Sequence, residues 1–319
     1  MLHALLLLTA AASAAPPDRR VAITVDDLPG VGPRIHAEDS RLDGIATELA
    51  RRTIPAIGFV NGCRDDLAQA ASWRDAGLAF GSHSCTHRRY SKLSWSEWET
   101  DLLRNQDRVR EVLGVELSGG WFRYPFLDHG GSVTRANRMA SWLEQQHTRL
   151  APVSLDTVDY LFNQAYVAAD GSPDVARLYV DAVMESAAWS EHLSRTLYER
   201  EVPLVLLVHA TALNADHLSD VLDGLEARGY RFVTLAEALD DPAYMAWGQG
   251  VPDPEGDGDA AFLPAAARAR GLELEDLVGP TAFEHVWAPR IRALAAGGSP
   301  SAPPDSTRRT HRSSERHPR

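Results

Sequence analysis

Apolar segments rich in β-branched and aromatic residues alternate along the chain with segments of helical periodicity. Seven segments have the composition of strands: residues 21–25, 54–60, 78–81, 120–124, 150–155, 203–208 and 230–234. Six have the periodicity of helices: residues 37–52, 64–76, 95–113, 131–146, 173–200 and 214–228. This alternation predicts parallel strands joined by helical crossovers. Seven such strands fit either an open doubly wound sheet or an incomplete (β/α) barrel.

Two of the predicted helices have clear signals in their sequences. In the helix at 95–113, Trp95 and Trp98 recur at helical spacing among charged residues, so we expect both rings to pack in the core. The last predicted helix begins at Asn214, a residue type that caps helix starts, and Gly229 follows its final turn. These signals give the predicted helices defined boundaries.

The N-terminal stretch, residues 1–14, differs in composition from the rest of the chain. It is a short apolar run that ends in the small residues Ala12, Ser13 and Ala14, a pattern typical of a secretory signal peptide. The run is too short to span a bilayer. We therefore expect this segment to be cleaved, no integral membrane segment to remain, and the protein to be periplasmic or secreted.

After the signal peptide, the chain divides into three parts. Residues 15–248 carry the alternating strands and helices and are long enough for one domain with its own core. Residues 249–296 have a weaker pattern, and we interpret them as a C-terminal extension packed on that domain. Residues 297–319 begin with GGSPSAPPDS and end in a basic run, which predicts a disordered tail.

Charge and cysteine content restrict the classes of function. The formal net charge of −12 argues against a nucleic-acid-binding protein, because such proteins present a basic face to the phosphate backbone. The two cysteines, Cys63 and Cys85, either form a disulfide in an exported chain or stay as buried thiols, and the sequence alone favours neither. Nothing in the sequence indicates the oligomeric state.

Polar residues of the types that bind metals or transfer protons follow the predicted strands. Asp26 and Asp27 end the first strand, and two adjacent carboxylates after an apolar run repel each other unless positive charge lies nearby. His83 and His87 follow the third strand, four residues apart, a spacing at which two imidazoles can reach one cation. Taken alone, the acidic pair also fits a solvated turn, and the two histidines also fit chance spacing.

Three further groups follow later strands. Arg123 lies in WFRYPF, where aromatic neighbours indicate burial and therefore a carboxylate partner. Asp156 and Asp159 lie in SLDTVDY, and His209 ends the apolar run PLVLLVH. One at a time, these groups also fit a surface arginine, an Asp-capped loop and a core histidine. The carboxyl ends of parallel strands share one edge of a sheet, so we expect these groups to converge there.

The order of these five groups resembles that of the polysaccharide deacetylases, carbohydrate esterase family 4, also called the NodB homology domain. The resemblance runs from about Val21 to Trp247 and implies a distorted, incomplete (β/α)7-type barrel of parallel strands. The five motifs of that family correspond to Thr24-Val25-Asp26-Asp27, His83-Ser84-Cys85-Thr86-His87, Arg123-Tyr124-Pro125, Asp156-Thr157-Val158-Asp159-Tyr160 and Leu206-Leu207-Val208-His209.

The resemblance implies a metal site made of Asp27, His83 and His87. Zn²⁺ is the first candidate for this site, and Co²⁺ or another divalent ion is the alternative, since such a donor set accepts several metals. One departure from the family pattern concerns this site. Cys85 lies between the two histidines, where a free thiol would compete for the metal or oxidise.

The resemblance also implies the groups that transfer protons. Asp26 is expected to be the catalytic base, held by Arg123. His209 is expected to be the general acid, held by Asp159, which favours its charged form.

Three residues are expected to contact substrate. Tyr124 follows Arg123, and a backbone N–H near it is an expected donor to the oxyanion. Leu206 is expected to border the acyl group. Tyr160 stands where the family has Trp, so an aromatic wall is retained with an added hydroxyl.

The expected function is metal-dependent hydrolysis of N-acetyl or other N-acyl groups from amino-sugar residues. The expected partner is an acetylated glycan, either chitin-like or peptidoglycan-like. Two alternatives stay open. The same site would also suit a non-sugar amide or ureide C–N bond, and a glycan-binding protein with an inactive site would retain the same fold.

Overall fold

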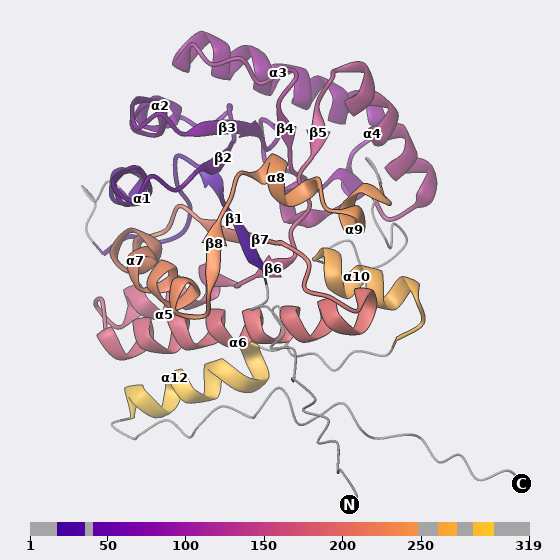
Figure 1. Ribbon diagram of the computed structural model, residues 1–319. Coiled ribbons are helices and arrows are strands. Elements are labelled where there is room, and N and C mark those ends of the chain that lie inside the picture. The colour runs from indigo at the N-terminus through magenta and orange to yellow at the C-terminus, as the bar shows by residue number, and fades with distance from the viewer. Residues whose placement is uncertain (1–17, 36–40, 248–260, 273–282, 297–319) are drawn as a thin grey trace, which may run out of the picture.

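The computed structural model describes residues 18–35, 41–247, 261–272 and 283–296 (Figure 1). The expected signal peptide and C-terminal tail lie outside these residues, as do two stretches of the expected extension. Among the helices of the described ranges, none is both long and apolar enough to cross a membrane.

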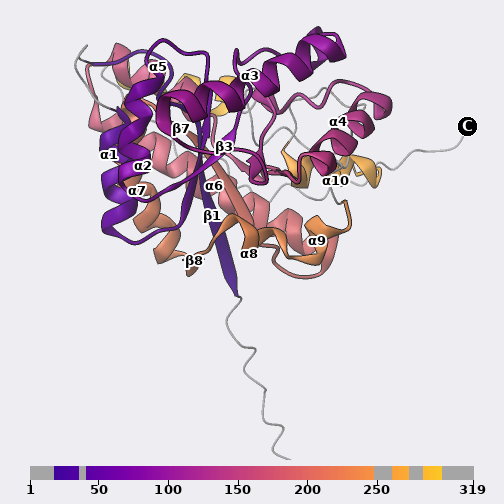
Figure 2. The same cartoon turned by 90° about the horizontal axis from the view of Figure 1, so that it is seen from above.

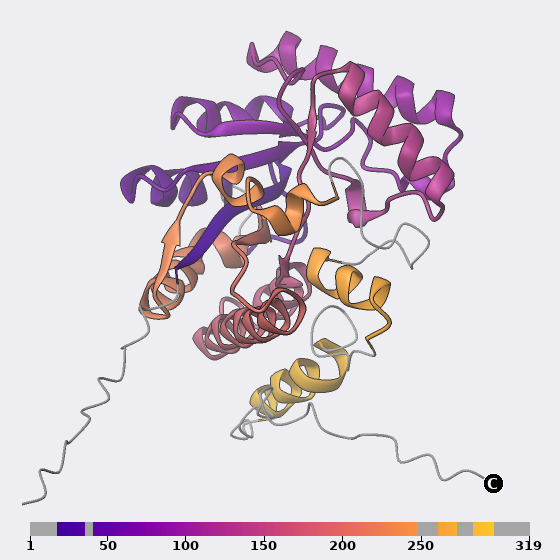
Figure 3. The same cartoon turned by 45° about the vertical axis from the view of Figure 1, so that its right-hand side comes forward.

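The centre of the fold is a curled sheet of parallel strands. The strands are β1 (Arg19–Leu28), β2 (Ala56–Val60), β3 (Ala79–Ser82), β4 (Trp121–Phe122), β5 (Arg149–Leu150), β6 (Leu155–Asp156), β7 (Leu204–His209) and β8 (Tyr230–Phe232). Their order is β5-β4-β3-β2-β1-β7-β6, and β8 pairs with the start of β1. The sheet curls into a half-barrel (Figure 3), which confirms the incomplete barrel rather than the open doubly wound sheet.

Helices surround this half-barrel. They are α1 (Arg41–Arg51), α2 (Ala71–Asp75), α3 (Trp95–Leu113), α4 (Val133–Gln145), α5 (Asp159–Ala168), α6 (Pro173–Tyr198), α7 (Ala212–Ala227), α8 (Leu235–Leu239), α9 (Pro242–Met245), α10 (Phe262–Ala269) and α12 (Ala288–Ala295). Short helical turns η1 (Leu67–Ala70), η2 (Tyr90–Lys92), η3 (Pro125–Leu127) and η4 (Phe283–Trp287) lie between them. In Figure 2, α1, α2 and α7 lie on one side of β1, and α4, α9 and α10 lie on the other.

The central strand β1 determines where the candidate residues lie. All of its residues from Val21 to Leu28 are buried, as expected for a parallel strand covered on both faces. It pairs with β2 on one side and with β7 on the other. Asp26 and Asp27, near its carboxyl end, are therefore surrounded by the carboxyl ends of neighbouring strands.

The strand expected at 150–155 is two short strands instead of one. β5 ends at Leu150, and β6 begins at Leu155. Pro152 lies between them and has no N–H to donate to a ladder, which explains the break. β5 and β6 are the first and last strands in the order of the sheet. The residues between them therefore connect its two open edges.

The start of α7 also differs from its prediction. Asn214 is not its N-cap, because the side chain of Thr211 accepts the capping hydrogen bond from the Asn214 N–H. Gly229 follows the helix with a positive φ of 84°, as its position predicted. In α3, Trp98 is fully buried as expected, whereas Trp95 is only partly buried.

The described parts of residues 249–296 pack on the barrel. The Phe162 ring of α5 contacts Phe283 and Trp287 at centroid distances of 5.0 and 5.9 Å, respectively. α12 lies against the outer side of α6, away from the strands (Figures 1 and 3). The Phe262 N–H, at the start of α10, donates to the carbonyl of Val153 between β5 and β6.

Gly58 in β2 is expected to tolerate no side chain. A Cβ there would lie 2.4 Å from Leu28 and 2.8 Å from the Trp73 ring. We expect Gly58→Ala to lower the free energy of unfolding by about 1–3 kcal/mol, measured by urea denaturation. Gly120→Ala is the control, because its Cβ would meet nothing nearer than 3.3 Å. Equal losses in the two variants would contradict this account of the packing.

Candidate active site

The structure brings the expected metal ligands together. Asp27 lies near the end of β1, and His83 and His87 lie in the loop after β3. One ligand atom from each residue lies within 4.8 Å of the others. The Nε2 atoms of His87 and His83 are 3.0 and 3.5 Å, respectively, from the same oxygen of Asp27, Oδ1. The three side chains therefore point at a common centre.

The ionisation states of these groups suit a divalent cation. Burial tends to raise the pKa of Asp27, but the hydrogen bond and charge of His87 outweigh burial and hold the pKa well below its usual range. Burial lowers the pKa of His83 to about 4. A carboxylate and a neutral imidazole are the forms that bind metals, so the residues present fit such an ion.

The orientation of His83 is set by a backbone carbonyl. Its Nδ1 lies 2.9 Å from the carbonyl oxygen of Arg123, so the proton on Nδ1 is donated there. This leaves the lone pair of Nε2 facing Asp27. A second hydrogen bond of this kind is the usual way in which a ligand histidine is held in one tautomer.

Asp26, the neighbour of Asp27, is held by a buried arginine. Nη1 of Arg123 donates to Asp26 Oδ1 and to Thr24 Oγ1, both at 2.7 Å. Arg123 is fully buried, and its Nε donates to the carbonyl of Ala151 while its guanidinium lies 4.3 Å from the Phe59 ring centroid. With Oδ1 occupied, Asp26 presents Oδ2 towards the cluster of Asp27, His83 and His87, 3.6 Å from His83 Nε2.

A second pair lies on the other side of the cluster. His209 pairs in register with Asp26 across β7 and β1, so both side chains lie on the same face of the sheet. Asp159, the first residue of α5, accepts from His209 Nδ1 through Oδ1 and from the His209 N–H through Oδ2, both at 2.7 Å. The imidazole is thereby fixed with Nε2 as its remaining nitrogen.

The pKa of His209 is raised by its neighbours. Burial alone would lower the pKa, but the charge and hydrogen bond of Asp159, together with the charges of Asp27 and Asp26, raise it to about 10. His209 is therefore protonated at neutral pH and paired with Asp159, while Asp26 is paired with the Arg123 guanidinium.

Asn214 is a site residue that the sequence analysis missed. Its amide donates to Asp159 Oδ2 and to the carbonyl of His209, and the Tyr179 hydroxyl donates to its carbonyl oxygen at 2.7 Å. The Tyr179 contact determines which end of the amide faces Asp159. In the sequence, only the position of Asn214 five residues after His209 indicated this contact. The preference of Asn for helix caps predicted a capping role instead.

Two of the three residues expected to contact substrate, Tyr124 and Leu206, have buried side chains. The Tyr124 side chain is buried in an aromatic cluster, with its ring 6.1 Å from Tyr90 and 4.9 Å from Phe122. Leu206 belongs to the main core, on the face of β7 opposite His209, because side chains alternate along a strand. Leu207 lies on the His209 face instead, in register with Thr24.

Tyr160, the third residue expected to contact substrate, lies next to His209. The Tyr160 ring is 5.8 Å from that of His209, nearly perpendicular to it. Next to His87, the ring of Phe126 lies 4.5 Å away and is 45% exposed. These two aromatic rings therefore adjoin the His209 side and the His87 side of the site, respectively.

Cys63 and Cys85 form a disulfide. The alternative of two buried thiols is therefore wrong. The free thiol that would have lain between His83 and His87 is absent as well, because both sulfur atoms are in the bridge.

The raised pKa of His209 predicts a pH-dependent stability in the metal-free protein. Because the folded-state pKa, about 10, exceeds the unfolded value of about 6.5, the ion pair with Asp159 stabilises fully below pH ~6.5. That contribution is lost as the pH rises towards 10. In urea denaturation with chelator, the difference in unfolding free energy between wild type and His209→Gln should shrink over this range. A constant difference would contradict the ion pair.

One family model matches part of the chain. Residues 13–141 match the family model described as polysaccharide deacetylase, and this range includes both aspartates, both ligand histidines and Arg123. No curated protein matches the chain. Two similar solved structures are a CE4 family pseudoenzyme from Bacillus anthracis and a mutant of it with restored enzymatic activity.

The wild type and this mutant are each 21% identical to the chain, with TM-scores of 0.50 and 0.51. Each alignment covers 71% of this chain, and 67% and 69%, respectively, of those chains. At this identity the likeness shows the fold alone. The matched range carries the Asp27, His83 and His87 cluster and the arginine-held Asp26, and the fold is the incomplete barrel expected with them, so this part of the chain is similar to the polysaccharide deacetylases.

Proposed function

We propose that the protein is a metal-dependent hydrolase that removes N-acetyl groups from amino-sugar residues of an oligo- or polysaccharide. One observation carries the proposal. A cluster of one carboxylate and two imidazoles that could hold a cation lies between an aspartate paired with a buried arginine and a histidine paired with a buried aspartate. Amide hydrolysis needs a base for the attacking water and an acid for the leaving amine, and these two pairs supply both.

Asp27, His83 and His87 would hold the metal. When bound, a divalent cation of the Zn²⁺ class polarises the amide carbonyl and makes water a better nucleophile. Zn²⁺ and Co²⁺ are both compatible with one carboxylate and two imidazoles.

Asp26 is the proposed base. Its Oδ1 is engaged by Arg123, so Oδ2 is the atom that takes the proton from the attacking water. Arg123 cannot move easily, because its contacts to Thr24, Ala151 and the Phe59 ring fix it in the barrel. The role of Arg123 is therefore to orient Asp26 and to balance its negative charge.

His209 is the proposed acid. Its Nδ1 is committed to Asp159, so the proton on Nε2 is the one that reaches the amine nitrogen as the C–N bond breaks. Asp159 stabilises the imidazolium before the proton is transferred, and the Asn214 amide donates a hydrogen bond that keeps Asp159 in place. Tyr160 adjoins the ring of His209 and is the proposed aromatic wall for the sugar.

The disulfide supports the expected location. Disulfides persist in oxidising compartments and are rare in the cytosol, and the chain begins with a signal-like segment. A periplasmic or secreted deacetylase would meet cell-wall or extracellular glycans. This location favours a glycan over a non-sugar amide or ureide as the substrate.

The direct test measures acetate. We expect metal-reconstituted protein to release free acetate from N-acetylated chito-oligosaccharides or peptidoglycan fragments, and His209→Ala to release at least about 100-fold less. Hydrolysis of small amides or ureides with no acetate from any glycan would support the second substrate class. Glycan binding with bound metal and no hydrolysis would establish the inactive alternative.

A second test separates the two adjacent aspartates. Asp26→Asn should bind Zn²⁺ with wild-type stoichiometry and lose at least about 100-fold in kcat, because it keeps the shape of the base without its basicity. Asp27→Asn should lose tight Zn²⁺ binding as well as activity. Metal analysis and acetate release on the same preparations check both. Loss of metal from Asp26→Asn alone would reverse the two assignments.

A further inference from the structure

The loop that carries two of the expected metal ligands, residues 83–87, is here called the metal-binding loop. Ser84 and His87 within it have positive φ angles of 62° and 52°. Residues with a Cβ are sterically disfavoured in this left-handed region. The loop therefore needs contacts from outside to hold the conformation in which its two imidazoles face Asp27.

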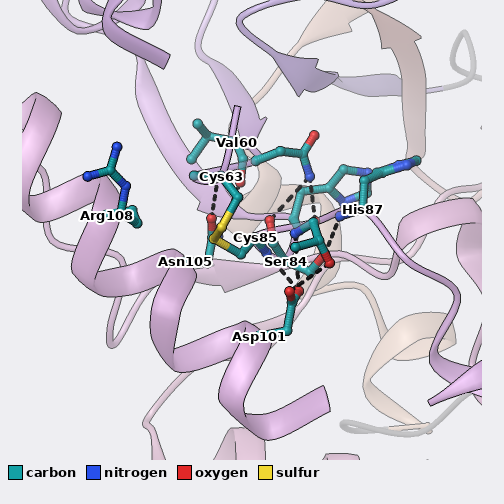
Figure 4. The surroundings of a disulfide bond; sticks show 12 residues. Val60, Cys63, Ser84, Cys85, His87, Asp101, Asn105 and Arg108 are labelled. Atoms are coloured by element: carbon teal, nitrogen blue, oxygen red, sulfur yellow. Dashed lines mark hydrogen bonds between the residues drawn. A yellow bond between two sulfur atoms is a disulfide. The ribbon is translucent and has the colours of Figure 1, made fainter. Parts of the chain in front are cut away.

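The first external contact is covalent. Cys85, at the centre of the loop, is bonded to Cys63 in the segment after β2, with a Cα–Cα distance of 4.8 Å (Figure 4). The Cys63 N–H also donates to the Cys85 carbonyl at 3.1 Å. Cys85 is 1% exposed, whereas Cys63 is partly exposed, so the half of the bridge that belongs to the loop is buried.

The second contact is a carboxylate from α3. Asp101 Oδ2 accepts from the N–H groups of Cys85 and Thr86 at 2.9 and 3.3 Å, and its Oδ1 accepts from the Thr86 hydroxyl at 2.7 Å (Figure 4). Both oxygens of this buried side chain are thus used on the two residues between Ser84 and His87. Asp101 has no place in the five motifs described above.

The loop is also held at its start. Asn61 donates to the carbonyls of His83 and Ser84 at 2.7 and 3.2 Å. The hydroxyl of Ser84 accepts from the His87 N–H at 3.1 Å, within the loop itself. These bonds fix the ends of the loop, whereas the bridge and Asp101 fix its centre.

We propose that the Cys63–Cys85 disulfide and Asp101 are positioning residues for the metal site. They hold the metal-binding loop so that the Nε2 atoms of His83 and His87 face Asp27 before an ion arrives. A loop ordered in advance loses less conformational entropy on binding, so the ion is bound more tightly. The inference rests on the proposed function only in requiring that this cluster binds a divalent cation.

The experiment measures Zn²⁺ affinity by competition with a chromophoric chelator. The variants are Cys63→Ser/Cys85→Ser, which leaves no unpaired thiol, and Asp101→Asn, which keeps the shape but replaces one acceptor oxygen with a donor. We expect each to bind Zn²⁺ at least about tenfold more weakly than wild type, the usual size of effect for residues that support metal ligands. The visible spectrum of the Co²⁺-loaded protein should change in both.

Ser94→Ala is the matched control. Ser94 caps the start of α3, the same helix that carries Asp101, and makes its capping hydrogen bonds with Glu97. This variant should lower the melting temperature but leave Zn²⁺ affinity within twofold of wild type and the Co²⁺ spectrum unchanged. Affinity would then follow the contacts with the loop and not the stability of the helix.

The inference fails if both loop variants bind Zn²⁺ within twofold of wild type, whatever their melting temperatures. If the double serine variant does not fold, Asp101→Asn decides alone by the same criterion. Acetate release is measured separately. Weakened metal binding in the variants of a protein that releases no acetate would uphold this inference and reject the proposed function.

Discussion

The buried ion pair between Arg123 and Asp26 is the interaction on which the site depends. Two adjacent carboxylates at the end of a buried strand are unfavourable without compensation. Arg123 compensates Asp26 directly at 2.7 Å, and two imidazoles converge on Asp27 from the other direction. The two aspartates are consequently neighbours in sequence with different partners, and the proposed function gives them different roles for that reason.

Much of the site could be predicted from the sequence because its chemistry lies at strand ends. Parallel strands place their carboxyl ends along one edge, so residues as distant as Asp27 and His87 meet once the order of elements is right. The order of the motifs, through their resemblance to a family, pointed to the Asp27, His83 and His87 cluster, to Arg123 and to His209. Charge predicted that a buried arginine has a carboxylate partner, and the resemblance indicated which carboxylate it is.

The parts that could not be predicted depend on which way a side chain points. Leu206 and Leu207 are the same residue type, and only the register with β1 shows that Leu207 is the one on the His209 face. Asn214 has a strong preference for helix caps, yet Thr211 takes that position and leaves the Asn214 amide for Asp159. Asp101 gives no sequence signal, because a helical aspartate is ordinarily a solvated residue.

The contact between Phe262 and Val153 bears on where this protein ends as a folding unit. The motifs stop before residue 248, and a truncated chain ending there would appear complete by sequence. Such a chain would lack the N–H that meets the Val153 carbonyl at the seam between β5 and β6, together with the apolar residues of α10. Such a chain would expose that carbonyl and the side chains of α6 that α10 covers, so α10 belongs to the same folding unit as the barrel.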